Sequence, residues 1–231
     1  MFAISDEVTG PVGGVERFFR RYPIAVRLPL AFDPAPMAEE LSRLPSSWWH
    51  AHLGPYHNGG WEAISLWAPG GDYRNQTSRG GPFAATEALT RSPQLQRAID
   101  AVPGVKNRVR LMRLRPGGEI LRHSDPLTEI DPALLRLHVP ITTNPAVDFR
   151  VDDRRVTMSA GETWHVDVRF PHQVRNNGAD PRVHLVLDVR SSPQLDALFA
   201  GGTSLGDGRL TFYFAKHLLP KGVLLRLGWG N

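Results

Sequence analysis

Between residues 106 and 190, short segments alternate apolar and polar side chains, and turn residues separate one segment from the next. Eight such segments follow one another: RVRLMRL, EILRH, LLRLHVPI, AVDFRV, RRVTM, ETWHVDV, HQVRN and RVHLVLDV. A period of two is typical of strands that bury one face. Eight closely spaced short strands favour a sandwich or a barrel, of which the jelly roll is the eight-stranded form. The sequence therefore predicts a mainly β fold of the jelly-roll type.

The length and composition fit one folded domain. The chain has 231 residues, of which 41% are hydrophobic and 22% charged, so disorder over the whole length is not expected. It contains 22 Gly and 20 Pro, which favours many turns over long helices. We expect a single domain over residues 1–231, with an N-terminal region at 1–105, the jelly-roll core at 106–190 and a C-terminal tail at 191–231.

Outside the alternating block, the sequence predicts helices and one further strand. Apolar residues at helical spacing predict helices over residues 34–44, 83–90, 93–102 and 194–199. The segment WEAISLWAP, at residues 61–69, alternates like a strand. We therefore expect N-terminal helices to flank the jelly roll.

Several functional classes are excluded or disfavoured. The absence of cysteine excludes disulfides, cysteine-based zinc sites and a cysteine nucleophile. The net charge is +4, but the basic residues are scattered, so we do not expect a nucleic-acid partner. No segment is long enough for a membrane span, and the polar residues 1–15 do not resemble a signal peptide. We expect a cytoplasmic protein with no membrane partner; the sequence does not predict the oligomeric state.

The strongest chemical signal is the tripeptide His123-Ser124-Asp125, followed at a distance by His172. Residues two apart on a strand point the same way, so His123 and Asp125 can face one point inside a barrel. His172, from a distant strand, would complete a set of two histidines and one carboxylate. A single histidine is more often a surface or core residue, but three such ligands on one face of Fe(II) leave positions for a cosubstrate and O2. We predict an Fe(II) site here.

Three basic residues add to this signal. Arg182 lies ten residues after His172, at the start of the next strand, and an inward guanidinium can bind a carboxylate in a bidentate way. Arg136 and His138 are two apart on an earlier strand, so together they can meet a second carboxylate. The alternative is that both arginines are exposed. Their strands otherwise consist largely of apolar residues and histidine, where an unpaired charge is costly.

The segment Pro69–Pro82 has the sequence PGGDYRNQTSRGGP, which is the composition of a long loop. Long loops in compact domains are often lids or binding loops. We predict that this loop carries substrate contacts, with Arg74 and Arg79 as candidate partners for a substrate carboxylate. A solvated surface loop is the alternative.

Five motifs stand in an order that resembles the aspartyl/asparaginyl β-hydroxylase family of 2-oxoglutarate oxygenases, and among its members the bacterial proline cis-hydroxylases most of all. The motifs, within residues 106–190, are PGGEILRHSD, RLHVPITTN, GETWHVD, PHQVRNNG and RVHLVLDV. The resemblance implies a double-stranded β-helix, which is a cupin-like jelly roll. It also implies iron ligands at His123, Asp125 and His172. The implied 2-oxoglutarate contacts are Arg182 for the side carboxylate, and Arg136 and His138.

The resemblance implies an Fe(II)- and 2-oxoglutarate-dependent hydroxylase of an amino acid, which can be free, peptidyl or carrier-bound. Asp125 argues against halogenation, because a halide needs that coordination position. Two alternatives stay open: a cupin-type metal dioxygenase or isomerase without 2-oxoglutarate, and a non-catalytic jelly-roll binding module. Inward Arg182 and Arg136 would disfavour the first, and the intact ligand set disfavours the second. Substrate choice should lie in residues 1–105, where no motif is recognised.

The other histidines have their own interpretations. His165 and Asp167 form a second H-x-D and an alternative ligand set, but the family match and the spacing to Arg182 favour His172. His184 is expected to support the site through a hydrogen bond. Three histidines near tryptophans are expected to form a loop or surface cluster rather than a metal site: His50, His52 and His57.

Overall fold

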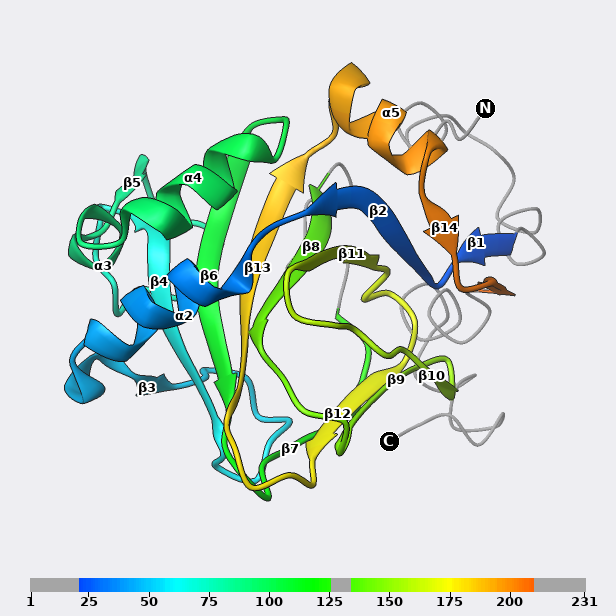
Figure 1. The fold of residues 1–231 in the computed structure, drawn as a ribbon, viewed down its shortest axis with the longest axis horizontal. Coiled ribbons are helices and arrows are strands. Elements are labelled where there is room, and N and C mark those ends of the chain that lie inside the picture. Colours follow the sequence, from blue (N-terminus) through cyan, green and yellow to red (C-terminus); the bar gives the residue numbers. More distant parts are fainter. Residues whose placement is uncertain (1–20, 126–133, 210–231) are drawn as a thin grey trace, which may run out of the picture.

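The computed structural model describes residues 21–125 and 134–209, and its strands form one large and two smaller sheets (Figure 1). The large sheet has nine strands with the hydrogen-bonded order β14-β2-β11-β8-β13-β6-β4-β3, and β5 pairs with β4. Its strands are β14 (Thr203–Ser204), β2 (Ala25–Ala31), β11 (Glu162–Val166), β8 (Leu134–Thr142), β13 (Arg182–Arg190), β6 (Lys106–Leu114), β4 (Trp61–Pro69), β3 (His50–Ala51) and β5 (Phe83–Ala85).

A four-stranded sheet, in the order β10-β9-β12-β7, packs against one face of the large sheet. Its strands are β10 (Arg154–Arg155), β9 (Val147–Val151), β12 (His172–Asn176) and β7 (Glu119–His123). Apolar residues of both sheets, such as Phe149 of β9 and Val186 of β13, share one buried cluster. β1 (Arg21–Pro23) and β15 (Asp207–Arg209) form a separate pair. The space between the four-stranded and the large sheet is the barrel interior of a jelly roll.

Helices cover the other face of the large sheet (Figure 1). They are α2 (Pro34–Arg43), α3 (Glu87–Thr90), α4 (Pro93–Ala101) and α5 (Pro193–Ala200), with a short 3₁₀ turn at Ser46–Trp48. α2, α4 and α5 each have proline in the first turn, where its missing N–H is not needed. The carboxylate of Glu40 in α2 accepts hydrogen bonds from the first backbone N–H groups of α4, which joins these two helices.

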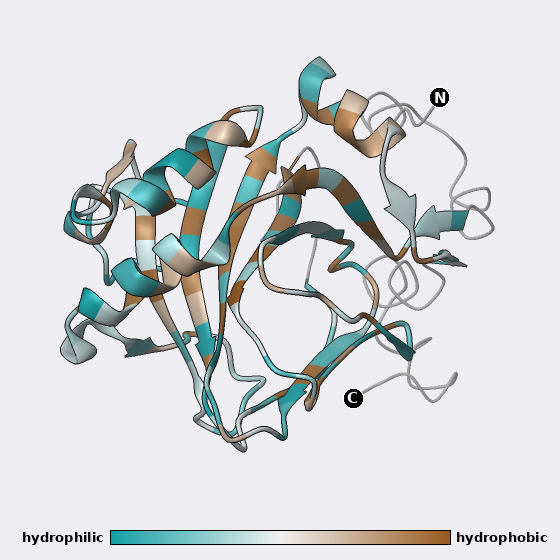
Figure 2. Cartoon of the chain, viewed as in Figure 1, coloured by the Kyte–Doolittle hydropathy of each residue, from teal (hydrophilic) through white to brown (hydrophobic). Residues whose placement is uncertain are grey.

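The large sheet has two faces of different chemistry. On β13, Val183, Leu185 and Leu187 pack into the core beneath the helices. The alternate residues of the same strand, including Arg182 and Asp188, face the barrel interior, and both are buried. Figure 2 shows the resulting brown and teal bands along these strands. Charged side chains are thus held inside the barrel by strands whose outer face is apolar.

Most predicted elements are confirmed. All eight strands expected between residues 106 and 190 are present, and so are the strand at 61–69 and the helices near 34–44, 93–102 and 194–199. The helix predicted over residues 83–90 is partly wrong. Its first three residues form β5, because their backbone pairs with the end of β4, and the helix begins only at Glu87.

Two regions of interest lie outside the described ranges. They are the polar leader at residues 1–15 and the part of the C-terminal tail from residue 210 onward. Within residues 21–125 and 134–209, no helix combines the length and the apolar character needed to cross a membrane.

Candidate metal centre

The three predicted metal ligands come together at the ends of two paired strands. His123 ends β7 and His172 begins β12, and the two residues are paired across the strands with ring centroids 4.3 Å apart. Asp125 follows β7, and its backbone N–H donates to the carbonyl of Val168 at 3.0 Å. One potential ligand atom from each side chain lies within 4.8 Å of the other two. This spacing suits three ligands on one face of a single metal ion.

Hydrogen bonds orient both imidazole rings. His123 Nδ1 donates to the carbonyl of Leu121 at 2.7 Å, and His172 Nδ1 donates to the carbonyl of Phe170 at 3.0 Å. A carbonyl oxygen only accepts, so Nδ1 carries the proton in each ring. The Nε2 lone pairs are therefore left for a metal, in the arrangement common to metal-binding histidines.

The charge states also suit a metal. Burial lowers the pKa of His172 to about 4, against the opposing effect of Asp125, so this ring is neutral at neutral pH. Burial disfavours ionisation of Asp125, but the adjacent Arg136 guanidinium outweighs it and holds the pKa of Asp125 far below the usual range. Two imidazoles and one carboxylate form a donor set that Fe(II) accepts.

The guanidinium of Arg136 forms hydrogen bonds with two carboxylates. Its Nη1 donates to Asp125 Oδ2 at 2.5 Å, and its Nε donates to Asp188 Oδ1 at 2.7 Å. Asp188 is itself buried and also accepts from Arg108 Nη2 at 2.8 Å. Arg136 therefore fixes the direction in which Asp125 points, as a hydrogen-bonded neighbour of a metal ligand does.

Arg182 is a buried cation without a counter-ion in the described part of the chain. Its side chain is only 2% exposed, and no carboxylate of the described residues pairs with it. Its Nη2 lies 2.8 Å from His184 Nδ1, and its Nε has no hydrogen-bond partner. Burial lowers the pKa of Arg182 to about 9. A buried guanidinium without a counter-ion destabilises the folded protein unless a bound anion neutralises its charge.

His138 lies near Arg182 and also lacks hydrogen bonds. Both of its ring nitrogens are buried without a partner among the described residues. Its ring centroid is 5.7 Å from that of His184. Burial, followed by the charges of Arg182 and Arg136, lowers its pKa well below the usual value, so the ring is neutral. One N–H and one lone pair are thus directed into the interior without a protein partner.

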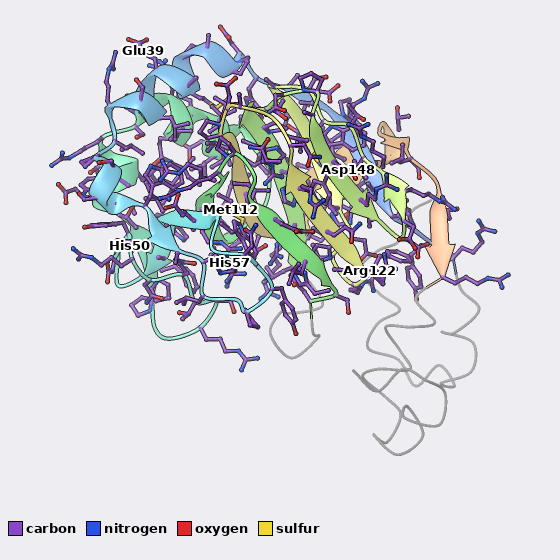
Figure 3. The ribbon with its side chains drawn as sticks, turned by 90° about the horizontal axis from the view of Figure 1, so that it is seen from below. Glu39, His50, His57, Met112, Arg122 and Asp148 are labelled. Atoms are coloured by element: carbon purple, nitrogen blue, oxygen red, sulfur yellow. The ribbon has the colours of Figure 1, made fainter. Side chains whose placement is uncertain are left out.

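Other predicted residues lie away from this group. His165 is on the opposite face of its strand, where its ring packs at 5.1 Å from Phe199, and Asp167 is paired with Arg169. His165 is therefore not part of the cluster. Figure 3 labels His50, which lies on β3, and His57, which lies on the segment that connects β3 to β4.

The loop at residues 69–82 carries both predicted arginines on its surface. Arg74 and Arg79 are exposed, and the guanidinium of Arg74 lies 4.7 Å from the ring centre of Tyr73. Gln76, and neither of these arginines, connects the loop to the barrel interior. Its backbone carbonyl accepts a hydrogen bond from Arg108 Nη1 at 2.8 Å.

Sequence reasoning missed several interior residues. Arg108 and Arg110 face the barrel from β6, and His52 and Tyr56 approach from the segment after β3. The ring of Tyr56 stacks at 4.6 Å on that of His123. The alternation in RVRLMRL gives the same signal for the two arginines that singled out Arg136. His52 was expected in a loop or surface cluster with His50 and His57, but its ring stacks on Trp61 and lies against Arg110. Nothing in the local sequence points to Tyr56.

Comparison with known proteins identifies relatives. The model of the aspartyl/asparaginyl beta-hydroxylase family matches residues 36–192. The L-proline cis-4-hydroxylase of Rhizobium meliloti (strain 1021) is 29% identical over 173 residues, which cover 70% of this chain and 59% of that protein. The chain thus spans less than two thirds of the length of this relative.

A solved structure shares the fold. The oxidoreductase of the 2OG-Fe(II) oxygenase family from Burkholderia pseudomallei superposes with a TM-score of 0.51 at 15% identity, covering 72% of this chain and 84% of that one. At this identity the likeness concerns the fold alone. The match of the family model, which extends over more than half of the chain, places this protein in the aspartyl/asparaginyl β-hydroxylase family.

Proposed function

We propose that this protein is an Fe(II)- and 2-oxoglutarate-dependent hydroxylase that acts on an amino acid or an amino-acid-derived substrate. The observation that carries the proposal is one juxtaposition inside the barrel. A set of two histidines and one carboxylate shares the interior with Arg182, a buried guanidinium without an acidic partner among the described residues. Family membership and the likeness to an L-proline cis-4-hydroxylase support it.

Iron would be held by Nε2 of His123, Nε2 of His172 and the carboxylate of Asp125. Arg136 keeps Asp125 ionised and oriented through its hydrogen bond to Oδ2. When bound, Fe(II) together with 2-oxoglutarate would activate O2 for insertion of a hydroxyl group into a C–H bond. The protein contributes the orientation of the ligands and an interior shielded by apolar side chains such as Phe149 and Trp164.

Cosubstrate binding is assigned to the unpaired polar groups of the interior. Arg182 would take the side carboxylate of 2-oxoglutarate, with its guanidinium positioned by His184. His138 would supply an N–H to the cosubstrate. Arg136 would contribute those N–H groups that its bonds to Asp125 and Asp188 leave available. A dicarboxylate therefore satisfies donors that otherwise stay buried without partners.

The two alternatives fit these observations less well. A cupin-type dioxygenase or isomerase that uses no keto-acid has no need of an interior cation such as Arg182. A non-catalytic binding module has no need of two imidazoles whose Nε2 lone pairs converge with a carboxylate. In both cases the cost of the buried groups would be left unexplained.

The proposal is tested by an anaerobic titration of the full-length protein with Fe(II) and 2-oxoglutarate, followed by a succinate-release screen in air. We expect one Fe(II) per chain, binding of 2-oxoglutarate that requires the metal, and succinate formation that one or more amino acids accelerate. Binding of iron without any release of succinate from 2-oxoglutarate would favour a cupin-type enzyme. Failure to bind iron would favour a binding module.

A further inference from the structure

The barrel interior holds more positive than negative charge. Four arginines face it from three adjacent strands, and two carboxylates accompany them: Arg108, Arg110, Arg136, Arg182, Asp125 and Asp188. The difference, four minus two, is two positive charges, of which Arg182 accounts for one. A second interior cation therefore also lacks a counter-ion among the described residues, and its position can indicate what else the barrel binds.

This second cation is Arg110. Its side chain is 2% exposed, and its Nη2 is 3.9 Å from Asp188 Oδ2, beyond hydrogen-bond distance. The oxygens of Asp188 already accept from Arg108 and Arg136 at 2.7 to 3.3 Å. Arg110 Nε has no hydrogen-bond partner in the described ranges. Asp188 is thus saturated by two arginines, and the third is left without a carboxylate of its own.

His52 lies against Arg110, but the two cannot form a hydrogen bond. The backbone N–H of Gly54 donates to His52 Nδ1 at 3.0 Å, so Nδ1 is the unprotonated nitrogen of the ring. Burial, followed by the charge of Arg110, lowers the pKa of His52 to about 2, so the ring is neutral and Nε2 carries the proton. Nε2 lies 3.3 Å from Arg110 Nη1. A guanidinium has no acceptor atom. Two hydrogen-bond donors therefore face each other with no acceptor between them.

Both donors are held in place. The His52 ring stacks on Trp61 with centroids 3.4 Å apart and planes 12° apart, and the His52 backbone N–H donates to the Trp61 carbonyl. Arg110 is fixed by burial on β6. The pair also borders the candidate metal centre, because Asp188 connects Arg110 to Arg136, which binds Asp125. A rigid donor pair beside a reactive centre is suited to position a substrate.

We infer that His52 Nε2–H and the Arg110 guanidinium bind the α-carboxylate of the substrate, a free amino acid. This inference rests on the proposed function. A carboxylate supplies two acceptor oxygens and one negative charge, which matches two converging donors and one uncompensated cation. A residue inside a peptide, or one tethered to a carrier through its carbonyl carbon, has no such α-carboxylate. Arg182 is then left for the cosubstrate.

The test measures binding of amino acids to the full-length protein loaded with Fe(II) and 2-oxoglutarate under anaerobic conditions. Equilibrium dialysis is run with L-proline and each other protein amino acid, and the tightest binder is compared with its carboxamide. We expect the acid to bind at least about 10-fold more tightly than the amide. The variant Arg110→Gln should weaken binding of the acid roughly 10- to 100-fold and abolish the difference in affinity between acid and amide.

Variants of His52 give a second and independent measurement. His52→Ala should weaken binding of the acid roughly 5- to 20-fold, because one hydrogen-bond donor is lost. His52→Gln keeps an N–H donor and should recover part of that loss. Should Arg110→Gln fail to fold, this pair of variants decides the question. Equal binding of acid and amide by the wild type, or no binding of any amino acid, overturns the inference.

Controls separate this inference from the proposed function. Arg113→Gln alters the same strand on its outer face, where Arg113 binds Glu62, and should leave acid binding unchanged. Iron stoichiometry and succinate release without substrate report the proposed function. If both persist in Arg110→Gln and acid binding is also unchanged, only the inference fails. If Arg110→Gln instead weakens binding of 2-oxoglutarate, Arg110 is part of the cosubstrate site and the inference is wrong.

Discussion

The two imidazoles of the candidate metal centre differ from His165 in what surrounds them. His172 directs Nε2 towards His123 and Asp125, while His165 packs against Phe199 on the opposite face of its strand. A histidine can act as a ligand only if its free nitrogen points at the shared centre. Orientation therefore distinguishes the two H-x-D motifs, which the tripeptides themselves do not.

At the residue scale, the first prediction is that His172→Ala loses stoichiometric Fe(II) binding while the fold survives. Two remaining ligands hold Fe(II) weakly, and the mutation removes a side chain at the end of β12 rather than in its middle. Iron content after desalting and circular dichroism measure the two effects. His165→Ala is the matched control and should keep its iron. Iron content and turnover like those of the wild type in His172→Ala would contradict the assignment and favour His165.

The second prediction concerns Arg182. Arg182→Met should raise the apparent KM for 2-oxoglutarate roughly 30- to 1000-fold, equivalent to about 2–4 kcal/mol, because a charge-assisted contact is lost. Iron binding should change little. Since Arg182 lacks an acidic partner in the described ranges, the variant should also leave the Tm of the ligand-free protein unchanged or raise it. A change in KM below about threefold would remove Arg182 from the cosubstrate site.

At the scale of elements, the loop at residues 69–82 connects β4 to β5 and is built on four glycines with positive φ: Gly70, Gly71, Gly80 and Gly81. Only glycine adopts this conformation without strain. The carbonyl of Gln76 ties the loop to the interior residue Arg108. The loop is also anchored to the sheet, because Ser65 of β4 donates hydrogen bonds to the carbonyls of Tyr73 and Asn75.

The third prediction is that Arg74→Ala or Arg79→Ala depresses substrate-coupled hydroxylation and spares the decarboxylation of 2-oxoglutarate without substrate. The reason is that iron and cosubstrate are assigned to strands elsewhere, whereas the loop arginines would meet the substrate. Succinate and hydroxylated product, quantified in the same reaction, give the coupling ratio. An unchanged ratio and an unchanged substrate KM in both variants would exclude the loop from the mechanism and turn attention to the segment from Trp48 to Trp67.

At the scale of the whole molecule, Asp188 joins three strands of the large sheet. From β13 it accepts hydrogen bonds from Arg108 on β6 and Arg136 on β8. Arg136 then reaches Asp125, which follows β7 of the four-stranded sheet. One buried carboxylate thus links the strands that carry the cationic groups to the metal ligands. Its removal would leave several guanidinium groups unpaired inside the barrel.

The fourth prediction is that Asp188→Asn lowers the free energy of unfolding by about 3 kcal/mol at neutral pH, measured by urea denaturation. Burial opposes ionisation of Asp188, but its arginine partners hold its pKa below the usual range. Its stabilising effect is therefore complete above the pKa of about 4 in the unfolded chain and is lost as the pH falls. The difference between wild type and variant should shrink in acid.

A surface carboxylate serves as control for this prediction. Asp153 pairs with Arg122 but is exposed, so Asp153→Asn should change stability little. A loss in Asp188→Asn no larger than in this control would mean that the interior arginines do not depend on Asp188.

The sequence by itself determined the strands and the candidate metal ligands. Strand alternation is a local pattern, since each side chain is directed by its own backbone, and all eight strands between residues 106 and 190 followed from it. His123 and Asp125 were found for the same reason, because two positions on one extended segment face the same way. His172 was added by its spacing to Arg182 and by the family resemblance.

Only the tertiary structure decided which charges meet. Arg136 and Arg182 look alike in sequence, yet cross-strand register places Arg136 beside Asp188 and leaves Arg182 with a histidine as its neighbour. His52 faces Arg110 because β3, β4 and β6 stand side by side, although the two residues lie far apart in the chain. Pairings between distant segments depend on how the sheets assemble, and that information is not contained in any local pattern.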